Sequence, residues 1–318
     1  MSEAVTTHPS WPSRDWLPIA VSTVGGVAAV RWADFADRRL TEPFFEDSAA
    51  KARRSCDPCF TALAELGDAA ELADTLQPSG FIFHLSRCGS TLVSQMLAAL
   101  PSVIAVSEAP PIDDVLRRGG EDMIPILHAI VRALGRRRTP EARHFIVKLD
   151  SWHMPLLPIF RRAFPCVPWV FLCRDPVEVM VSHARQPGMQ MVPGLHPGVM
   201  LGLAPTLDDF GYHVLARICA AALDGLEHGG GRVVDYAALP DAVFSTILPH
   251  FGITIGVEER AAMVATTRRH AKRPERMFVA DEAAKQADAS NDIREGIERH
   301  VGGLYDRLLA AAISNPRR

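Results

Sequence analysis

A short loop of small and hydroxyl residues follows the apolar run FIFHL (81–85) and precedes a helical pattern. The N-terminus of a helix presents unpaired N–H groups and a partial positive charge, which together favour phosphate-like anions. Glycine lets the backbone approach such an anion closely, and arginine adds a permanent charge with several donors. The loop therefore predicts an anion site. Its residues are Arg87, Cys88, Gly89, Ser90 and Thr91.

Two familiar phosphate chemistries do not fit this loop. A nucleotide-hydrolase loop places lysine directly after its second glycine and a hydroxyl residue on Mg²⁺, whereas Ser90 follows Gly89 here. A nucleophilic Cys88 would need a phosphate-binding arginine a few residues on, and the chain continues Gly-Ser-Thr-Leu-Val-Ser. The remaining interpretations are an anion loop with Arg87 as its cation, or a helix start that Ser90 simply caps.

A second polar element is CRDPVEVMVSHAR (173–185), which follows the apolar run WVFLC (169–173). Arg174 ends the run, and Pro176 suits the first turn of a helix. Ser182 lies two helical turns further on, so Arg174 and Ser182 could reach one anion from two sides. The structural alternative is that Arg174 pairs with Asp175 or another acid.

These polar groups follow strand-length apolar runs that alternate with helical patterns. Such runs are typical of a parallel sheet buried on both faces, and ligands of such sheets bind at the carboxyl ends of the strands. We therefore expect an α/β, three-layer fold with a central parallel sheet flanked by helices. The expected strands are FIFHL (81–85), VIAV (103–106), HFIVKL (144–149), WVFLC (169–173) and RVVDY (232–236).

The first part of the chain has a different pattern. Two β-rich runs around Gly25-Gly26 predict a hairpin, and a helix is expected from about Phe60 to Thr75. We expect residues 1–76 to be an accessory segment packed on a main domain of residues 77–318. Within that domain, the Gly-, Pro- and Met-rich stretch 186–205 has the length of a functional loop and is a lid candidate.

Composition narrows the class of protein. The net charge of −3 argues against a general nucleic-acid binder. The six cysteines are scattered, which suits reduced thiols better than a disulfide framework, and Cys56 with Cys59 lacks the second pair that zinc requires. The sequence shows neither a secretory signal nor an apolar run long enough to span a membrane. We expect a soluble cytoplasmic protein without a metal.

Together the two polar elements resemble the sulfotransferase family that uses 3′-phosphoadenosine 5′-phosphosulfate (PAPS). Members carry Lys or Arg, a small residue, Gly and two hydroxyl residues in the first loop, and an Arg with a Ser eight residues on. Those positions are Arg87 to Thr91, Arg174 and Ser182 here. The form of the loop looks most like the carbohydrate and tyrosylprotein branches and many bacterial members. The resemblance implies that the loop binds the 5′-phosphosulfate and the Arg/Ser pair binds the 3′-phosphate.

Two further segments extend the resemblance. VVDYAALPDAVFSTILPHFGI (233–253) is similar to the family's Tyr-Glu-Asp-Leu segment, with Tyr236 at the tyrosine but Ala-Ala in place of Glu-Asp. RHAKRPERM (269–277) resembles the basic C-terminal loop, which implies a 3′-phosphate contact by Arg273. Cys88 replaces the usual serine, a mild departure because the loop acts mainly through its backbone.

Sulfuryl transfer requires a base for the acceptor proton and cations for the leaving phosphate. By analogy with phosphoryl transfer, positioning and electrostatics carry the catalysis. The resemblance implies Glu108 as the base, Lys148 at the sulfuryl oxygens or leaving group, and Arg87 at the leaving 5′-phosphate. Asp150 and His153 are the alternative bases. No metal takes part in this scheme.

The expected reaction moves a sulfuryl group from PAPS to a hydroxyl or amine of a small-molecule or carbohydrate acceptor, leaving 3′,5′-bisphosphate adenosine (PAP). The sequence specifies neither the acceptor nor the oligomeric state. Two other hypotheses remain: a P-loop kinase of a small hydroxyl substrate, and a non-catalytic nucleotide-binding module.

Overall fold

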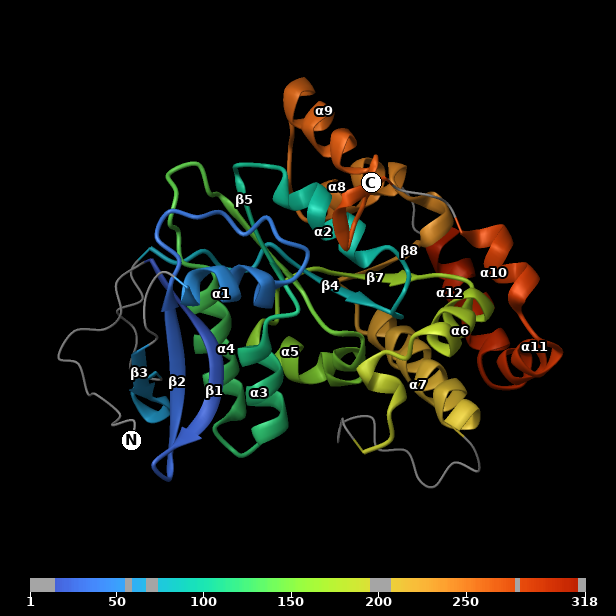
Figure 1. The fold of residues 1–318 in the computed structure, drawn as a ribbon, viewed down its shortest axis with the longest axis horizontal. Helices are drawn as coiled ribbons and strands as arrows, with labels where there is room; N and C mark the ends of the chain where they lie inside the picture. The colour runs from blue at the N-terminus through green and yellow to red at the C-terminus, as the bar shows by residue number, and fades with distance from the viewer. Residues whose placement is uncertain (1–14, 55–58, 67–73, 195–206, 278–280, 314–318) are drawn as a thin grey trace.

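The computed structural model describes residues 15–54, 59–66, 74–194, 207–277 and 281–313 (Figure 1). At its centre lies a five-stranded, wholly parallel sheet in the order β5-β6-β4-β7-β8. The apolar runs expected as strands are all strands, with ends within a residue of expectation. They are β4 (Gly80–His84), β5 (Val103–Ser107), β6 (His144–Lys148), β7 (Trp169–Cys173) and β8 (Gly231–Asp235). The expected α/β class is confirmed.

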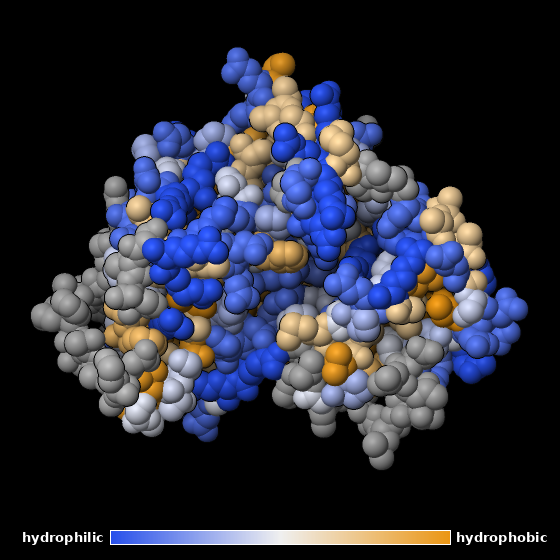
Figure 2. All heavy atoms as spheres, viewed as in Figure 1, coloured by the Kyte–Doolittle hydropathy of each residue, from blue (hydrophilic) through white to orange (hydrophobic). Residues whose placement is uncertain are grey.

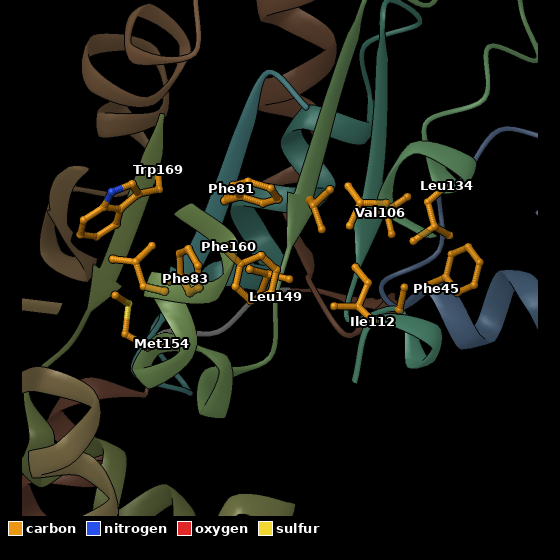
Figure 3. Packing of buried hydrophobic residues seen from close by; sticks show 14 of the residues in the cluster. Phe45, Phe81, Phe83, Val106, Ile112, Leu134, Leu149, Met154, Phe160 and Trp169 are labelled. Atoms are coloured by element: carbon orange, nitrogen blue, oxygen red, sulfur yellow. The ribbon is translucent and has the colours of Figure 1, made fainter. Parts of the chain in front are cut away.

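Helices cover both faces of this sheet (Figure 1). Successive strand residues point to opposite faces, so Phe81 and Phe83 of β4 pack in one core cluster while Ile82 packs in the other. Figure 3 shows the aromatic residues of the first cluster, where Phe160 meets Phe83 edge to face with ring centroids 5.6 Å apart. Burial on both faces explains why the strand sequences are apolar almost throughout.

Among the described α-helices, eight contribute buried residues to the first cluster and three to the second. The first group is α1 (Phe45–Arg53), α3 (Pro110–Arg118), α4 (Met123–Leu134), α5 (Leu157–Ala163), α6 (Pro176–Arg185), α7 (Leu207–Glu227), α11 (Asn291–Ile297) and α12 (Gly303–Ile313). The second group is α2 (Ser90–Ala98), α8 (Leu248–His250) and α9 (Val257–Thr266). The remaining described α-helix is α10 (Glu282–Asp288).

The N-terminal segment forms a separate antiparallel sheet in the order β1-β2-β3. Its strands are β1 (Trp16–Val24), β2 (Val27–Asp34) and β3 (Cys59–Ala62). Gly25 and Gly26 have φ values of 57° and 83°, which confirms the expected hairpin and explains its glycines. The helix expected from Phe60 was wrong at its start, because residues 59–62 pair with β2 instead. The indole N–H of Trp32 donates to Thr61 Oγ1 at 2.9 Å across this pairing.

The N-terminal sheet packs against the helices of the main sheet. The Val21 amide donates to Asp114 Oδ2 of α3 at 2.8 Å, and Arg136 Nη1 donates to the Trp16 carbonyl at 2.9 Å. Phe45 of α1 and Phe81 of β4 belong to one continuous core cluster (Figure 3). The described residues of the N-terminal segment therefore share a hydrophobic core with the main sheet. The domain boundary between residues 76 and 77 stays a prediction.

The remaining described elements are a short hairpin and several single turns. The hairpin strands are β9 (Arg269–His270) and β10 (Arg273–Met277). Among the described helices, none is long and apolar enough to cross a membrane. The face seen in Figure 2 is mainly hydrophilic, with apolar residues in small separate patches. The second half of the lid candidate, residues 195–205, and Cys56 lie outside the described residues.

Candidate active site

The anion loop joins β4 to α2 with an unusual backbone conformation. Ser86, Arg87 and Gly89 have φ values of 80°, 53° and 80°, and non-glycine residues rarely adopt this region. Gly89 is the N-cap of α2 and makes no side-chain cap, so the interpretation of Ser90 as the N-cap was wrong. The first N–H groups of α2 therefore keep their capacity to bind an anion.

Arg87 and Cys88 have different surroundings within this loop. Arg87 Nη2 donates to the Gln186 carbonyl at 2.8 Å, which ties the loop to the end of α6. Cys88 is fully buried, and its thiol lies 3.2 Å from the Leu172 carbonyl of β7. Burial raises the pKa of Cys88 to about 11, so at neutral pH it is a thiol and not a nucleophilic thiolate. Ser90 and Thr91 are both buried.

Glu108 and Lys148 meet at the ends of β5 and β6. Their side chains form a close ion pair, and the Glu108 amide donates to the Lys148 carbonyl at 2.8 Å. His84, at the end of neighbouring β4, has its Nε2 3.5 Å from Glu108 Oε1. Burial alone would raise the pKa of Glu108, but Lys148 and His84 outweigh it and hold the pKa well below its usual value. The described carboxylate is thus ionised, with Lys148 as its close partner and His84 Nε2 further away.

The alternative bases, Asp150 and His153, have structural partners. Asp150 caps the turn that begins at Ser151, and His153 Nε2 lies 3.0 Å from Asp113 Oδ1. Burial, and then the charge of Glu108, raise the pKa of Asp150 well above its usual value. A buried cap and a histidine held by Asp113 are less suited to receive an acceptor proton than the partly exposed Glu108.

Arg174 lies on the other side of the loop, at the end of β7, with its donors occupied. Its Nε donates to Glu178 Oε2 at 2.6 Å, and its Nη2 is 3.3 Å from Asp281 Oδ1. Its Nη1 donates to the Arg87 carbonyl at 3.5 Å, which joins the two predicted elements directly. Ser182 is buried, and its hydroxyl donates to the Glu178 carbonyl at 2.9 Å. Pairing of Arg174 with an acid, the structural alternative, is therefore what the free protein has.

Tyr236 packs between Arg174 and the anion loop. The Arg174 guanidinium lies 4.1 Å from the centroid of the Tyr236 ring. A Cβ atom on Gly89 would lie 2.9 Å from Tyr236 Cδ2 and 2.8 Å from Leu239 Cδ1. This close approach explains the glycine and brings the third predicted segment to the same edge of the sheet.

Arg273 is exposed on β10, whereas its neighbour Lys272 interacts electrostatically with Arg87 of the loop and with Lys148. Lys272 keeps surface in solvent, yet its Nζ lies 5.7 Å from the Phe44 ring centroid, and Lys148 Nζ lies 5.8 Å from the same centroid. Burial of the ammonium, followed by the charges of Arg87 and Lys148, lowers the pKa of Lys272 to about 8. Lys272 is therefore a further cation of this site.

Two buried histidines also belong to the site and are absent from the sequence interpretation. His183 of α6 accepts from the Gly188 amide through Nδ1 at 3.1 Å, and burial, Arg87 and Lys272 lower its pKa to about 3. The sequence interpretation missed His84 because it lies in an apolar strand, and it missed His183 because attention went to the adjacent Ser182. Their positions could have identified them, since His84 directly precedes the anion loop and His183 lies in the segment that contains Arg174 and Ser182.

No family model and no curated protein matches the sequence. Among solved structures, the chain is similar to sulfotransferase STF1 from Mycobacterium tuberculosis H37Rv at 17% identity, covering 76% of this chain and 82% of that one, with a TM-score of 0.46. It is similar to the sulfotransferase domain from the curacin biosynthetic pathway at 18% identity, covering 77% and 94%, with a TM-score of 0.44. Mouse sulfotransferase SULT7A1 complexed with PAP matches at 12% identity over 80% and 92%, with a TM-score of 0.41. At this level of likeness, function must be argued from the residues of this chain.

Proposed function

We propose that this protein is a sulfotransferase that uses PAPS as donor. The observation that carries the proposal is an anion loop flanked by Lys148 on one side and Arg174 on the other, with a carboxylate beside Lys148. Both cations act electrostatically on Cys88 at the centre of the loop. Two cations either side of a helix N-terminus suit a donor that carries anionic groups at both its 5′ and 3′ ends.

The loop residues fit the 5′-phosphosulfate. The N–H groups at the start of α2, the hydroxyls of Ser90 and Thr91, and the Arg87 guanidinium are the donors for it. The donor supplies the sulfuryl group, whose bond to the 5′-phosphate breaks as a bond to the acceptor oxygen or nitrogen forms. Arg87 and the N–H groups stabilise the negative charge that collects on the leaving phosphate.

Glu108 and Lys148 have different roles in the proposed transfer step. Glu108 accepts the proton that the acceptor hydroxyl or amine loses, a step that contributes about 10²–10⁴ in rate. Lys148 turns from Glu108 to the sulfuryl or leaving oxygens and balances charge there. The acceptor is a small-molecule or carbohydrate hydroxyl or amine.

Arg174, Ser182 and Tyr236 are the proposed 3′-phosphate contacts, with Arg273 as an outer one. In the free protein Glu178 and Asp281 neutralise Arg174. The 3′-phosphate therefore replaces at least one carboxylate at Arg174. Asp281 is the one that can leave at lower cost, because about half of its side chain is already in solvent, whereas only 10% of Glu178 is exposed.

A thermal-shift panel tests the proposal. The protein is heated with PAP, with ATP and Mg²⁺, or in buffer, and we expect only PAP to raise the melting temperature. Binding at 100 times the Kd stabilises the folded state by about 2.7 kcal/mol. Stabilisation by ATP with Mg²⁺ instead would favour the kinase hypothesis. Binding of PAP without transfer from PAPS across an acceptor panel would favour a non-catalytic nucleotide-binding module.

A further inference from the structure

His84 has two ring nitrogens in very different situations. The ring is buried at the end of β4. Its Nδ1 accepts a hydrogen bond from the Ser86 amide at 3.1 Å. Its Nε2 is buried and makes no hydrogen bond to any described residue, although Glu108 Oε1 lies 3.5 Å away. A buried donor without a partner costs free energy and calls for an explanation.

The hydrogen bond at Nδ1 determines where the proton of the ring resides. Because Nδ1 accepts, the neutral ring carries its proton on Nε2, on the side of Glu108. Burial is the largest effect on the ring and, with Lys148 nearby, lowers the pKa of His84 to about 4, so the ring is neutral at pH 7. His84 can therefore donate its Nε2–H to Glu108 while the imidazole ring itself is uncharged.

Glu108 is within reach of two donors, but only Lys148 holds it closely in the free protein. An anion bound at the loop attracts Lys148, and Glu108 then loses its principal partner. Hydrogen bonds of catalytic groups are often long in free proteins and shorten when the ligand arrives. Once Lys148 has moved to the anion, the Nε2–H of His84 is positioned to donate a hydrogen bond to the Glu108 carboxylate.

We propose that His84 is a positioning residue that holds the Glu108 carboxylate once an anion has drawn Lys148 away. The same ring fixes the anion loop, because Nδ1 binds the amide of Ser86, whose φ is 80°. His84 thus couples the filling of the loop to the placement of the base. This inference rests on the proposed role of Glu108, whose charged neighbours are Lys148, Asp150 and Lys272.

Two substitutions separate the two nitrogens. In His84→Asn the side-chain oxygen can replace Nδ1 as acceptor for Ser86, while the donor to Glu108 is lost. In His84→Gln the longer amide can present an N–H near the position of Nε2, while the acceptor for Ser86 is lost. Melting temperatures and circular dichroism establish that both variants fold.

For His84→Asn we expect PAP affinity within about threefold of wild type and a kcat reduced about tenfold. The acidic limb of the pH profile of kcat, which reports the enzyme with its ligands bound, moves upward by about half a unit to one unit, because a hydrogen bond that stabilised ionised Glu108 is missing. For His84→Gln we expect the limb to stay in place and PAP affinity to fall about 3- to 10-fold, the worth of one hydrogen bond. Identical profiles in the two variants would overturn the proposal.

A readout without turnover separates this inference from the proposed function. The ¹⁵N–¹H resonance of the His84 Nε2–H is followed while inorganic sulfate, and separately PAP, is added to wild-type protein. We expect a downfield proton shift as the hydrogen bond to Glu108 shortens, and no such shift in Glu108→Gln. Transfer from PAPS with an unmoved resonance overturns the role of His84 alone. A shift with sulfate but no binding of PAP contradicts the PAPS proposal alone.

Discussion

Glu108 is subject to two opposing electrostatic effects at the residue scale. Its burial favours the neutral acid, whereas the Lys148 ammonium and His84 favour the carboxylate and lower its pKa. A carboxylate with a low pKa is a weak base, so its value as a base depends on the departure of Lys148. In the proposed mechanism, ligand binding therefore activates Glu108 by drawing Lys148 away from it.

Glu108→Gln is expected to abolish turnover while PAP affinity stays within a few fold. The amide keeps the size of the side chain but cannot take the acceptor proton, which removes about 10²–10⁴ of the rate. Turnover at saturating donor and calorimetry with PAP are the two measurements. The matched control is Glu121→Gln at an exposed position of the same chain, and a near wild-type rate in Glu108→Gln would exclude this residue as the base.

His183 makes the stability of the fold depend on pH. Burial, Arg87 and Lys272 lower its pKa to about 3, whereas a histidine in the unfolded chain has a pKa of about 6.5. Between these values the unfolded state binds a proton that the folded state does not. The free energy of unfolding therefore falls as the pH falls through this window and is fully retained above it.

His183→Asn should remove this dependence while keeping an acceptor for the Gly188 amide. From pH 7 to pH 5 we expect the wild type to lose about 1–2 kcal/mol more stability than the variant. Denaturant titrations at both pH values provide the comparison, with exposed His228→Asn as control. Parallel losses in wild type and His183→Asn would contradict the buried neutral imidazole.

At the scale of elements, α10 is held against α6 by polar contacts over Arg174. Asp281, just before α10, pairs with Arg174, and Gln286 Nε2 donates to Asp175 Oδ2 at 2.8 Å. Arg185 of α6 also pairs with Asp288 of α10. These contacts hold α10 next to Arg174, and so next to the proposed 3′-phosphate site.

Arg174→Ala and Ser182→Ala are expected to weaken PAP binding, each by about tenfold or more, since charge-assisted contacts contribute about 1.5–3 kcal/mol. Asp281→Asn is expected to strengthen it a few fold, because a competitor for Arg174 loses its charge. Asp288→Asn, at the opposite end of α10 and paired with Arg185, is the matched control. Calorimetry with unchanged affinities in the two alanine variants would remove Arg174 and Ser182 from the site.

The junction of β4 and α2 gives a second prediction at this scale. Gly89→Ala should destabilise the protein by about 2–4 kcal/mol, through left-handed strain and collision with Tyr236 and Leu239. Gly25→Ala in the β1–β2 hairpin turn is the control, because Gly25 has a φ of 57° but no atom within 4 Å of its Cβ, so the substitution introduces strain without a collision. Thermal unfolding should show a larger loss of stability in Gly89→Ala than in the control variant, because only Gly89→Ala adds a collision. Equal losses of stability would mean that Tyr236 does not pack closely on the loop.

The elements of the main sheet were predictable because their strands are buried on both faces. Phe81, Ile82 and Phe83 all had to be apolar, which made β4 visible in the sequence. The strand at residues 59–62 was not predictable in this way, because its pairing with β2 is a long-range contact. The meeting of Glu108 with Lys148 followed from strand ends, whereas the acids on Arg174 depend on the docking of α10, which no local pattern encodes.

At the scale of the whole molecule, the N-terminal sheet shares its core with the main domain. Trp32 of β2 is fully buried, with Arg136 lying 5.3 Å from its ring centroid. The contacts of Val21 with Asp114 and of Trp16 with Arg136 bind this sheet to α3 and the segment after α4. Unfolding of the accessory segment should therefore expose part of the main core.

Trp32→Ala is expected to cost about 3–5 kcal/mol and to lower the melting temperature of the molecule in one transition. Val27→Ala at the half-exposed hairpin tip should change stability by less than about 0.5 kcal/mol. Calorimetry resolves the transitions. A new early transition confined to the N-terminal segment would instead establish residues 1–76 as an independently folding unit.

The acids around Arg174 have a consequence for the ionic conditions in which the protein binds its ligand. An arginine facing solvent attracts mobile anions, so added salt screens it and weakens a phosphate contact there. Arg174 already has two tethered counterions, Glu178 and Asp281, in the free protein. Nucleotide binding then exchanges one fixed anion for another and releases few mobile ones. The contribution of the 3′-phosphate contact to affinity should therefore change little with ionic strength. Arg87 has no carboxylate partner among the described ion pairs, so the contact of Arg87 with the 5′ end of the proposed donor should account for most of the salt dependence of binding.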